Sequence, residues 1–419
     1  MKPYKLADQA VQLEHDFAIC IRKQIQWGFA FDVPAAAQLY ATLSAKREEL
    51  NTELQELFPP IVLPAGHPKG LKTKTKTIIF NPGSRMHIAE RFMSTGWRPE
   101  KHTNEGRPQI DEAILREIGT PEADKLNEYL LVSKRISQLA EGDTAWMKLE
   151  KHRRIHGDVM TNSCITGRCA HRHPNMSAVP NLSSPYGKEC RSLFTATGAD
   201  WDLIGIDFSG LEMRVCAHYT STFDDGALIE EVCDGDIHTT NAKAFGVDRN
   251  TAKSVLYAQL YGAGEARLGS LVGGTPADGR KLKKKFYSRW PGIADLQDQI
   301  DHTLKVRGYL TGLDGRILPM RGKAFAAINT LFQAGGSTLV KNFTVALHKR
   351  LVAEGFDYGQ DWAQCNHVHD EVQIETRKPL SSTASEIAIA EIPKSGADFG
   401  FRCPLEGEVS IGRNWADTH

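Results

Sequence analysis

The sequence predicts a mixed α+β fold in which strands from distant parts of the chain meet among many helices. The first third has helical periodicity, and so has the segment from about 220 to 322. Short β-prone runs surround Asp207 and Asp370, which lie far apart in the chain. With 419 residues, the chain is long enough to form several subdomains.

Four helices are expected in the first third, from the spacing of apolar residues and from the capping residues beside them. They cover residues 5–22, 34–57, 81–94 and 121–141. Gly96 closes the third of them. Proline and glycine between residues 58 and 70 predict a loop.

The first candidate site residue is Asp207, at the end of a predicted buried strand over residues 202–208 that Gly205 interrupts. A carboxylate in such a place has to be paired or has to hold a cation. Ser209 and Glu212 follow with the spacing of a capping box, which predicts a helix start. The local order is therefore strand, carboxylate, helix.

Two further carboxylates, those of Asp370 and Glu371, lie between β-prone residues. Val368 precedes the pair and Val372 follows it, which predicts a hairpin with both carboxylates at its tip. The alternative is a solvated turn, because tight turns favour Asp for local reasons. If this tip met Asp207, the oxygen ligands would suit Mg²⁺.

A helix from about residue 249 to 261 is predicted between Asp248, a good N-cap, and Gly262. Residues four apart advance by only about 40°, so two cations and two tyrosines share one stripe: Arg249, Lys253, Tyr257 and Tyr261. Cations in the first turns oppose the helix dipole, which is easier to understand if an anion binds there. The alternative is an exposed cationic stripe with the tyrosines in the core.

These segments resemble family A DNA polymerases, and most closely those of the bacteriophage replicase type. DFSGLEMRV resembles motif A of the family, RNTAKSVLYAQLYGAG motif B and VHDEV motif C. Further matches are ITGRCAHRHPNMSAVPN, GDIHT, LDGR, AAINTLFQAGG and IGRNWADTH, all in the family's order. The similarity spans nearly the whole chain, and the ordered set is far more specific than any single string.

The resemblance implies a right-hand polymerase fold with an antiparallel palm sheet, helical fingers and a helical thumb. The expected domains are a thumb with N-terminal helices over 1–150, a palm over 151–219 and 323–419, and fingers over 220–322.

For the metals, the resemblance implies two Mg²⁺ ions, which Mn²⁺ is expected to replace. Their ligands would be Asp207, Asp370 and the backbone carbonyl of Phe208, with Glu371 as a weaker ligand. Lys253 is the expected proton donor to departing pyrophosphate, and is catalytic together with Asp207 and Asp370.

For the substrates, the resemblance implies two further groups of residues. The expected deoxynucleoside triphosphate contacts are Ser209, Gly210, Leu211, Glu212, His238, Arg249, Lys253 and Tyr257. The expected primer-template DNA contacts are Arg168, Tyr261, Asn329, Gln333 and His369.

The implied function is template-directed DNA synthesis, in which deoxynucleotides join the 3′ end of a primer by two-metal-ion nucleotidyl transfer. Glu212 has two interpretations, since it fits a capping box and also matches the family residue that excludes a 2′-hydroxyl. Three other classes stay open: a single-subunit RNA polymerase, a two-metal nuclease and a non-catalytic nucleic-acid binding protein.

Composition sets looser bounds. The chain has 51 Lys and Arg residues and 51 Asp and Glu residues, so its net charge does not indicate a nucleic-acid partner. The segment 66–77 carries Lys69, Lys72, Lys74 and Lys76, and is a candidate DNA-backbone contact or else a solvated loop. Four further lysines in KLKKKF, residues 281–286, are expected to serve solubility.

The eight cysteines lack the spacing of a zinc site and predict inert thiols in a reducing compartment. His367 and His369 alternate before Asp370, but hard oxygen ligands favour Mg²⁺ over a transition metal. No apolar run has membrane-spanning length and no signal peptide begins the chain, so we expect a cytoplasmic enzyme, in the host cytoplasm if a phage encodes it.

Three departures from the family carry expectations of their own. The sequence holds no acidic exonuclease motif, so we expect extension without proofreading, with any exonuclease or replisome protein a separate partner. The region 59–79 is short where the phage relatives carry a thioredoxin-binding insertion, so thioredoxin is not expected to act. Phe325 stands where relatives often have a basic DNA contact.

Overall fold

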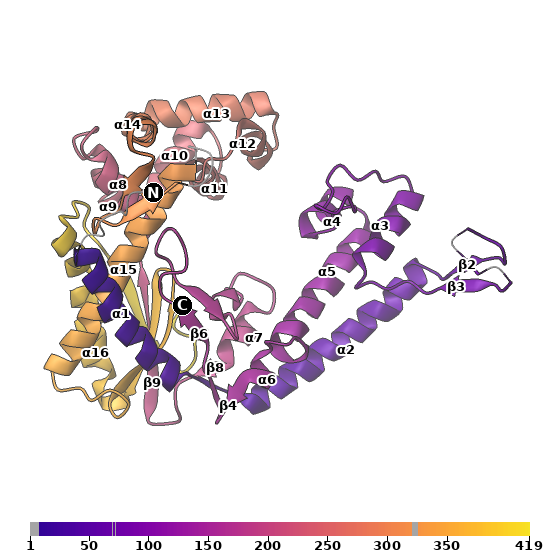
Figure 1. The fold of residues 1–419 in the computed structure, drawn as a ribbon, viewed down its shortest axis with the longest axis horizontal. Helices are drawn as coiled ribbons and strands as arrows, with labels where there is room; N and C mark the ends of the chain where they lie inside the picture. The colour runs from indigo at the N-terminus through magenta and orange to yellow at the C-terminus, as the bar shows by residue number, and fades with distance from the viewer. Residues whose placement is uncertain (1–7, 69, 72, 321–325) are drawn as a thin grey trace. The chain divides into compact units, whose positions relative to one another are not determined.

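The computed structural model describes residues 8–68, 70–71, 73–320 and 326–419. The chain forms two compact units, a smaller one over residues 32–153 and a larger one over the rest (Figure 1). Helices and antiparallel sheets occur together, so the predicted α+β class is confirmed. None of the helices in the described part combines the length and the apolar character that crossing a membrane requires.

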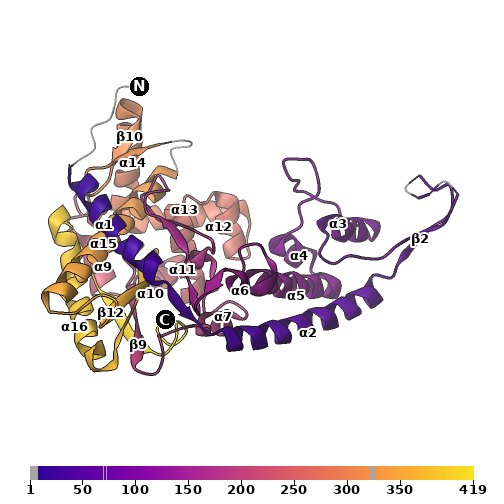
Figure 2. The ribbon, with the colours of Figure 1, turned by 60° about the horizontal axis from the view of Figure 1, so that its bottom comes forward.

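The smaller unit consists mainly of helices. Its elements are α2 (Val33–Leu57), β2 (Ile61–Leu63), β3 (Lys76–Ile78), α3 (Arg85–Ser94), α4 (Glu112–Ile118), α5 (Pro121–Ile136), a π-helical turn (Ser137–Glu141), α6 (Trp146–Leu149) and β4 (Glu150–Lys151). Helix α2 packs against α5, and Figure 2 shows its length with β2 beyond its C-terminal end. Phe58, Phe80 and Phe92 pack together in the core of this unit.

The predicted helices of the first third are observed, with shifted ends. Helix α2 begins at Val33 because the Asp32 side chain accepts a hydrogen bond from the Ala35 N–H. Helix α3 begins at Arg85 rather than at 81, because Ser84 is its N-cap. The loop expected over 58–70 is partly wrong, since β2 pairs with β3 in an antiparallel ribbon.

The larger unit contains most of the helices. They are α1 (Asp8–Trp27), α7 (Gly187–Ser192), α8 (Leu211–Thr220), α9 (Ala227–Cys233), α10 (Ile237–Phe245), α11 (Arg249–Leu260), α12 (Glu265–Leu271), α13 (Pro276–Arg289), α14 (Pro291–Arg307), α15 (Ala327–Ala353) and α16 (Ser381–Glu391). Helix α1 packs against α15 and β12, so residues 8–31 lie with the larger unit rather than with residues 32–150.

The strands of the larger unit form three small antiparallel groups and one main sheet. They are β1 (Phe29–Phe31), β5 (Arg154–Ile155), β6 (Asp158–Met160), β7 (Ala170–Arg172), β8 (Phe194–Thr195), β9 (Trp201–Phe208), β10 (Tyr309–Thr311), β11 (Ile317–Pro319), β12 (Trp362–Val368), β13 (Glu371–Arg377) and β14 (Gly407–Gly412). In the main sheet the order is β12-β13-β9-β14, so the predicted sheet of strands distant in sequence is confirmed.

Strand β9 is one of the two inner strands of the main sheet, paired on one side with β13 and on the other with β14. Gly205 is required there. A Cβ at this position would overlap the Thr418 carbonyl oxygen and lie 2.7 Å from Nε2 of Gln373. The glycine that interrupts the apolar run therefore allows the chain's C-terminal segment to pass close to the strand.

Helix α15 is buried along most of its length and packs against α1, α8 and α16. Helices α10 to α14 gather at one end of the larger unit (Figure 1). The expectation that residues 220–322 are mainly helical is confirmed for the described residues. Its exception is the hairpin of β10 and β11, whose connection carries the LDGR string.

Candidate active site

Asp207 and Asp370 lie at the same edge of the main sheet. Asp207 is the penultimate residue of β9, and its register partner on β13 is Glu371. Asp370 immediately precedes β13, and its carbonyl accepts a hydrogen bond from the Phe208 N–H at 3.2 Å. The fold thus brings two acids 163 positions apart in the chain to neighbouring backbone positions.

The tip of the hairpin differs from the prediction. Its two turn residues are His369, with a φ of 57°, and Asp370. Glu371 is already part of β13 and is buried. The prediction that both carboxylates lie at the tip is confirmed for Asp370 and wrong for Glu371, because Glu371 already pairs with Val368 and Asp207 as a strand residue and its side chain is buried.

The Glu371 carboxylate is held by surrounding donors. It accepts hydrogen bonds from the indole N–H of Trp415 and from Nε2 of Gln373, the latter at 2.7 Å. Its Oε2 lies 3.7 Å from Nη1 of Arg191 and 3.4 Å from Nδ1 of His419. These contacts explain how a charge can be buried in this position.

The surroundings of Asp207 and Asp370 disfavour the charged form of both carboxyl groups. Burial raises the pKa of Asp207 to about 7, and repulsion from Asp370 and Glu371 adds to this effect. Burial also raises the pKa of Asp370. A buried acidic pair that lacks full compensation from protein cations is an environment that favours a bound cation.

Arg191 is a residue of this site that the sequence analysis missed. It lies on α7, is buried, and has its guanidinium 4.5 Å from the ring centre of Trp415. It is the cation that lowers the pKa of Asp207 against the other influences. The sequence offered one indication of this role. Arg191 lies close to the apolar pair Leu193-Phe194, and an arginine that is buried with such residues needs an acidic partner.

Glu212 does not form the predicted capping box. Helix α8 begins at Leu211 with Gly210 as its N-cap, and no side chain caps it. The Glu212 carboxylate instead accepts a hydrogen bond from Nη2 of Arg168 at 2.9 Å and another from the Tyr261 hydroxyl. The capping interpretation is therefore wrong, because two partners distant in sequence take the carboxylate.

Helix α11 forms as predicted. The Asp248 side chain accepts hydrogen bonds from the N–H groups of Asn250 and Thr251, both at 3.0 Å. The two tyrosines of the stripe are in contact, since the rings of Tyr257 and Tyr261 are stacked with centroids 6.3 Å apart.

The alternative interpretation placed both tyrosines of the stripe in the core, and the exposure of Tyr261 contradicts it. Arg249 and Lys253 are exposed, and 44% of Tyr261 is accessible, so the tyrosines are not both core residues. The Tyr261–Glu212 hydrogen bond joins α11 to α8, the helix that follows Asp207. The C-terminal end of α11 is therefore joined to the helix that begins four residues after Asp207.

His238 joins this cationic group from α10. Its ring centre lies 6.3 Å from that of Tyr257, and burial together with Lys253 and Arg249 lowers its pKa. Its Nδ1 is buried without a hydrogen-bond partner. Arg249 forms an ion pair with Asp236, with Nε 3.1 Å from Oδ2. Three basic groups thus lie together around the first turns of α11.

The remaining candidates occupy three elements. Asn329 and Gln333 lie one turn apart on α15, where Nε2 of Gln333 donates to Oδ1 of Asn329 at 3.0 Å. His369 lies in the hairpin turn. Ser209 directly follows β9 and donates its N–H to the carbonyl of Glu406, the residue before β14. Phe325, Lys69 and Lys72 lie outside the described residues.

The donor set suits a hard cation whose coordination a substrate completes. Within the described ranges, no group of three or more His, Cys, Asp or Glu side chains is arranged to hold a metal ion. Mg²⁺ commonly takes only one or two carboxylates together with substrate phosphates and water. Asp207, Asp370 and the Phe208 carbonyl fit that pattern. The eight cysteines, all of them described, are free thiols.

Comparison with known proteins gives consistent matches over nearly the whole chain. The family model described as DNA polymerase family A matches residues 43–417. The DNA-directed DNA polymerases of Enterobacteria phage T3 and Escherichia phage T7 are each 34% identical to this chain, over 98% of it and 70% of the relative. The thermostable DNA polymerase I of Thermus filiformis is 25% identical over 93% of this chain and 46% of its own length.

A solved structure has the same fold. The POL domain of Pol1 from M. smegmatis, in complex with DNA primer-template and dNTP, superposes with a TM-score of 0.82 at 20% sequence identity. The match covers 97% of this chain and 70% of that one.

Proposed function

This chain belongs to DNA polymerase family A, and on that premise we propose that it extends the 3′ end of a DNA primer by two-metal-ion nucleotidyl transfer. It is a DNA-directed DNA polymerase, a nucleotidyltransferase. The observation that carries the proposed mechanism is the meeting of Asp207 and Asp370 at one sheet edge, with α11 joined to it through Tyr261 and Glu212.

The divalent ions would be held by Asp207, Asp370 and the Phe208 carbonyl. The buried Glu371 would be a weaker ligand. When bound, a pair of Mg²⁺ ions would lower the pKa of the primer hydroxyl and neutralise charge on the departing pyrophosphate. Arg191 supports this arrangement by balancing part of the acidic charge from the protein side. The two aspartates act as ligands and not as nucleophiles.

The basic groups on α10 and α11 would bind the triphosphate of the incoming nucleotide. Arg249 and Lys253 are exposed on the first turns of α11, where the helix N-terminus also favours an anion. His238 adds a third basic group. Lys253 would give a proton to pyrophosphate as it leaves.

Tyr257, Glu212 and the 209–211 backbone would surround the sugar and base of the nucleotide. The Glu212 carboxylate would lie under the deoxyribose and exclude a 2′-hydroxyl. Tyr261 would lie beside the templating base, and the primer-template would contact Arg168, Asn329, Gln333 and His369. Support comes from two hydrogen bonds that hold Arg168 and Tyr261 against the Glu212 carboxylate.

We propose the main sheet as the palm, α9 to α14 as the fingers and the smaller unit as the thumb. This assignment follows the predicted division, except that residues 8–31 pack in the larger unit.

Primer extension with single-residue variants tests the proposal. Asp207→Ala and Asp370→Ala should each abolish nearly all incorporation, because each removes an anionic ligand, while binding of a primer-template duplex is largely retained. Asp357→Ala removes an exposed carboxylate elsewhere in the larger unit and should extend like the wild type. Full activity of either site variant would refute the assignment.

The cofactor and substrate are tested in the same assay. Withholding Mg²⁺ should stop extension, and Mn²⁺ should restore it. Ribonucleotides should be poor substrates, which separates this function from an RNA polymerase. Incubating a mismatched primer without nucleotides tests the prediction that these 419 residues do not edit, because shortening of the primer would contradict it.

A further inference from the structure

Arg168 lies on an irregular connection that has to be held in place by its surroundings. Met160 of β6 pairs with Ala170 of β7, so residues 161–169 form the connection between these two strands. Within it, the Gly167 N–H donates to the Cys164 carbonyl at 2.9 Å, and the Arg168 N–H donates to Oγ1 of Thr166 at 3.4 Å. These local bonds alone are few for a segment that carries a site residue.

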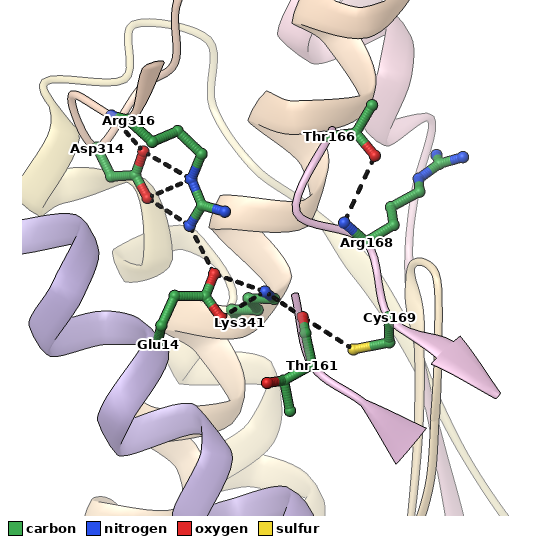
Figure 3. A network of polar contacts seen from close by, with 8 residues as sticks. All are labelled: Glu14, Thr161, Thr166, Arg168, Cys169, Asp314, Arg316 and Lys341. Carbon is green, nitrogen blue, oxygen red and sulfur yellow. Dashed lines mark hydrogen bonds and ion pairs between the residues drawn. The ribbon is translucent and has the colours of Figure 1, made fainter. Parts of the chain in front are cut away.

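Four charged side chains form a network beside this connection (Figure 3). Glu14 of α1 accepts hydrogen bonds from Nζ of Lys341 at 2.6 Å and from Nη2 of Arg316 at 2.7 Å. Arg316 in turn binds Asp314, with Nη2 2.6 Å from Oδ2. Two cations and two anions therefore balance. Only 1% of Lys341 is exposed, and Asp314 is equally buried.

The network contacts the connection near both of its ends. Nζ of Lys341 donates to the Thr161 carbonyl at 2.7 Å, and the Cys169 thiol lies 3.8 Å from the same oxygen. The Arg316 guanidinium lies against Gly167, where an added Cβ would overlap Nη1. Lys341 thus holds the first residue of the connection, and Arg316 packs on the residue that precedes Arg168.

Stability alone is a weak reason for such a network. Taking four charges out of water costs about as much as their pairing returns, and apolar replacements of buried ion pairs are often neutral or stabilising. A fully satisfied polar network does, however, define one geometry. Here that geometry is transmitted to Arg168, whose Nη2 binds Glu212 at 2.9 Å.

We propose that Lys341, Glu14 and Arg316 are positioning residues that fix the 161–169 connection and so set Arg168 against Glu212. None of the three is among the residues that contact substrate in the proposed function. The expected effect on nucleotide incorporation rests on the proposed function. The expected effect on the order of the connection does not, because it can be measured without catalysis.

Hydrogen exchange of the full chain, followed by mass spectrometry, tests the structural part. In Lys341→Met, amides of residues 161–169 should exchange about tenfold faster, because one hydrogen bond to a charged group is lost. The matched control is Lys349→Met. Lys349 lies on the same helix and pairs with Asp16 of α1 at 2.8 Å, but its side chain is 70% exposed and, in the described part of the chain, it forms no hydrogen bond or ion pair with the connection. The control should leave exchange at 161–169 unchanged.

A double-mutant cycle tests the kinetic part. Lys341→Met should lower kcat/KM for single-nucleotide incorporation by about tenfold in the wild-type background, the loss expected for about 1.4 kcal/mol. In an Arg168→Ala background the same substitution should change it by less than about twofold, because the group that it positions is gone. A merely structural role would give the same loss in both backgrounds.

A charge-balanced variant keeps the test decisive if Lys341→Met does not fold. Glu14→Gln with Lys341→Met leaves Arg316 paired with Asp314, so no buried charge is left unpaired. Faster exchange at 161–169 in either folded variant supports the inference, and wild-type exchange there overturns it. Failure of the wild-type chain to extend a primer would refute the proposed function instead, and would leave the exchange result valid.

Discussion

At the scale of single residues, Glu212 combines the most interactions of the site in one side chain. Its carboxylate accepts from Arg168 and from the Tyr261 hydroxyl, so it links the connection before motif A to α11. Two hydrogen bonds hold this carboxylate in one position before substrate binds. Little further side-chain entropy is then lost if it contacts the sugar of a nucleotide, as the proposed function requires.

Replacing Glu212 by Ala should therefore relax the exclusion of ribonucleotides. The ratio of kcat/KM for a deoxynucleotide to that for its ribonucleotide is expected to fall by about tenfold to a hundredfold, the range for loss of one discriminating contact. Glu212→Gln keeps the side chain's size and should retain more of the discrimination. An unchanged ratio in the Ala variant would show that the carboxylate only organises its neighbours.

A buried histidine should make the stability of the chain depend on pH. His348 of α15 binds Oε1 of Gln364 through Nε2 at 2.7 Å, and burial lowers its pKa to about 4, with Lys23 acting in the same direction. The unfolded chain, with a pKa near 6.5, binds more protons between these values. The free energy of unfolding should then be fully retained above pH 6.5 and fall between pH 6.5 and 4, by at most on the order of 3 kcal/mol from this group.

Urea unfolding at pH 7.5 and at pH 5 measures this effect. His348→Gln cannot take up a proton, so its unfolding midpoint should fall less between the two pH values than that of the wild type. His302→Gln, at an exposed position of α14, is the control and should behave like the wild type. Equal pH dependence in His348→Gln and wild type would contradict the prediction.

At the scale of elements, α11 carries the proposed contacts to phosphate. The Asp248 cap fixes where the helix begins, and the four-residue spacing then puts Arg249 and Lys253 on one side of it. The Arg249–Asp236 ion pair shows that this side already attracts a carboxylate.

Arg249→Ala and Lys253→Ala should each lower kcat/KM for nucleotide incorporation by about tenfold to a hundredfold, since hydrogen bonds to charged groups contribute roughly 1.5–3 kcal/mol. Lys284→Ala is the matched control, because it removes an equally exposed positive charge from α13 in the KLKKKF patch. A loss of the same size in the control would mean that net charge, and not the stripe, determines nucleotide use.

At the scale of the whole molecule, the chain consists of two units that each have a core of their own. The smaller unit carries the β2–β3 ribbon, with exposed Val62 and Lys74 among its described residues. This ribbon replaces the predicted loop and is short compared with the insertion that the resemblance would place there.

Thioredoxin should therefore leave product length unchanged. Extension on a long primed single strand, with a trap that prevents rebinding, measures the length synthesised per binding event. Adding a large excess of thioredoxin is expected to shift the product distribution by no more than the same excess of serum albumin. A marked increase in product length would show that the ribbon region captures this partner.

Features that depend on residues within a few positions of one another could be predicted from the amino-acid sequence. The Asp248 cap, the stripe on α11, the apolar run of β9 and the hairpin around Asp370 all follow from periodicity and capping, and the structure has all of them. The prediction that Asp207 and Asp370 lie close together came from the family resemblance, because no local pattern relates these two positions.

The partners of the buried and half-buried charged side chains could not be predicted, because they depend on how distant segments pack. Glu212 has the spacing of a capping box, yet its partners are Arg168, 44 positions before it, and Tyr261, 49 positions after it. Glu371 and Arg191 are likewise buried together although they are distant in sequence, because the sheet places Glu371 and the packing of α7 places Arg191 beside it. A charged side chain that is buried on folding needs hydrogen-bond partners or a group of opposite charge. Packing across the whole chain determines which of these groups lie close to it.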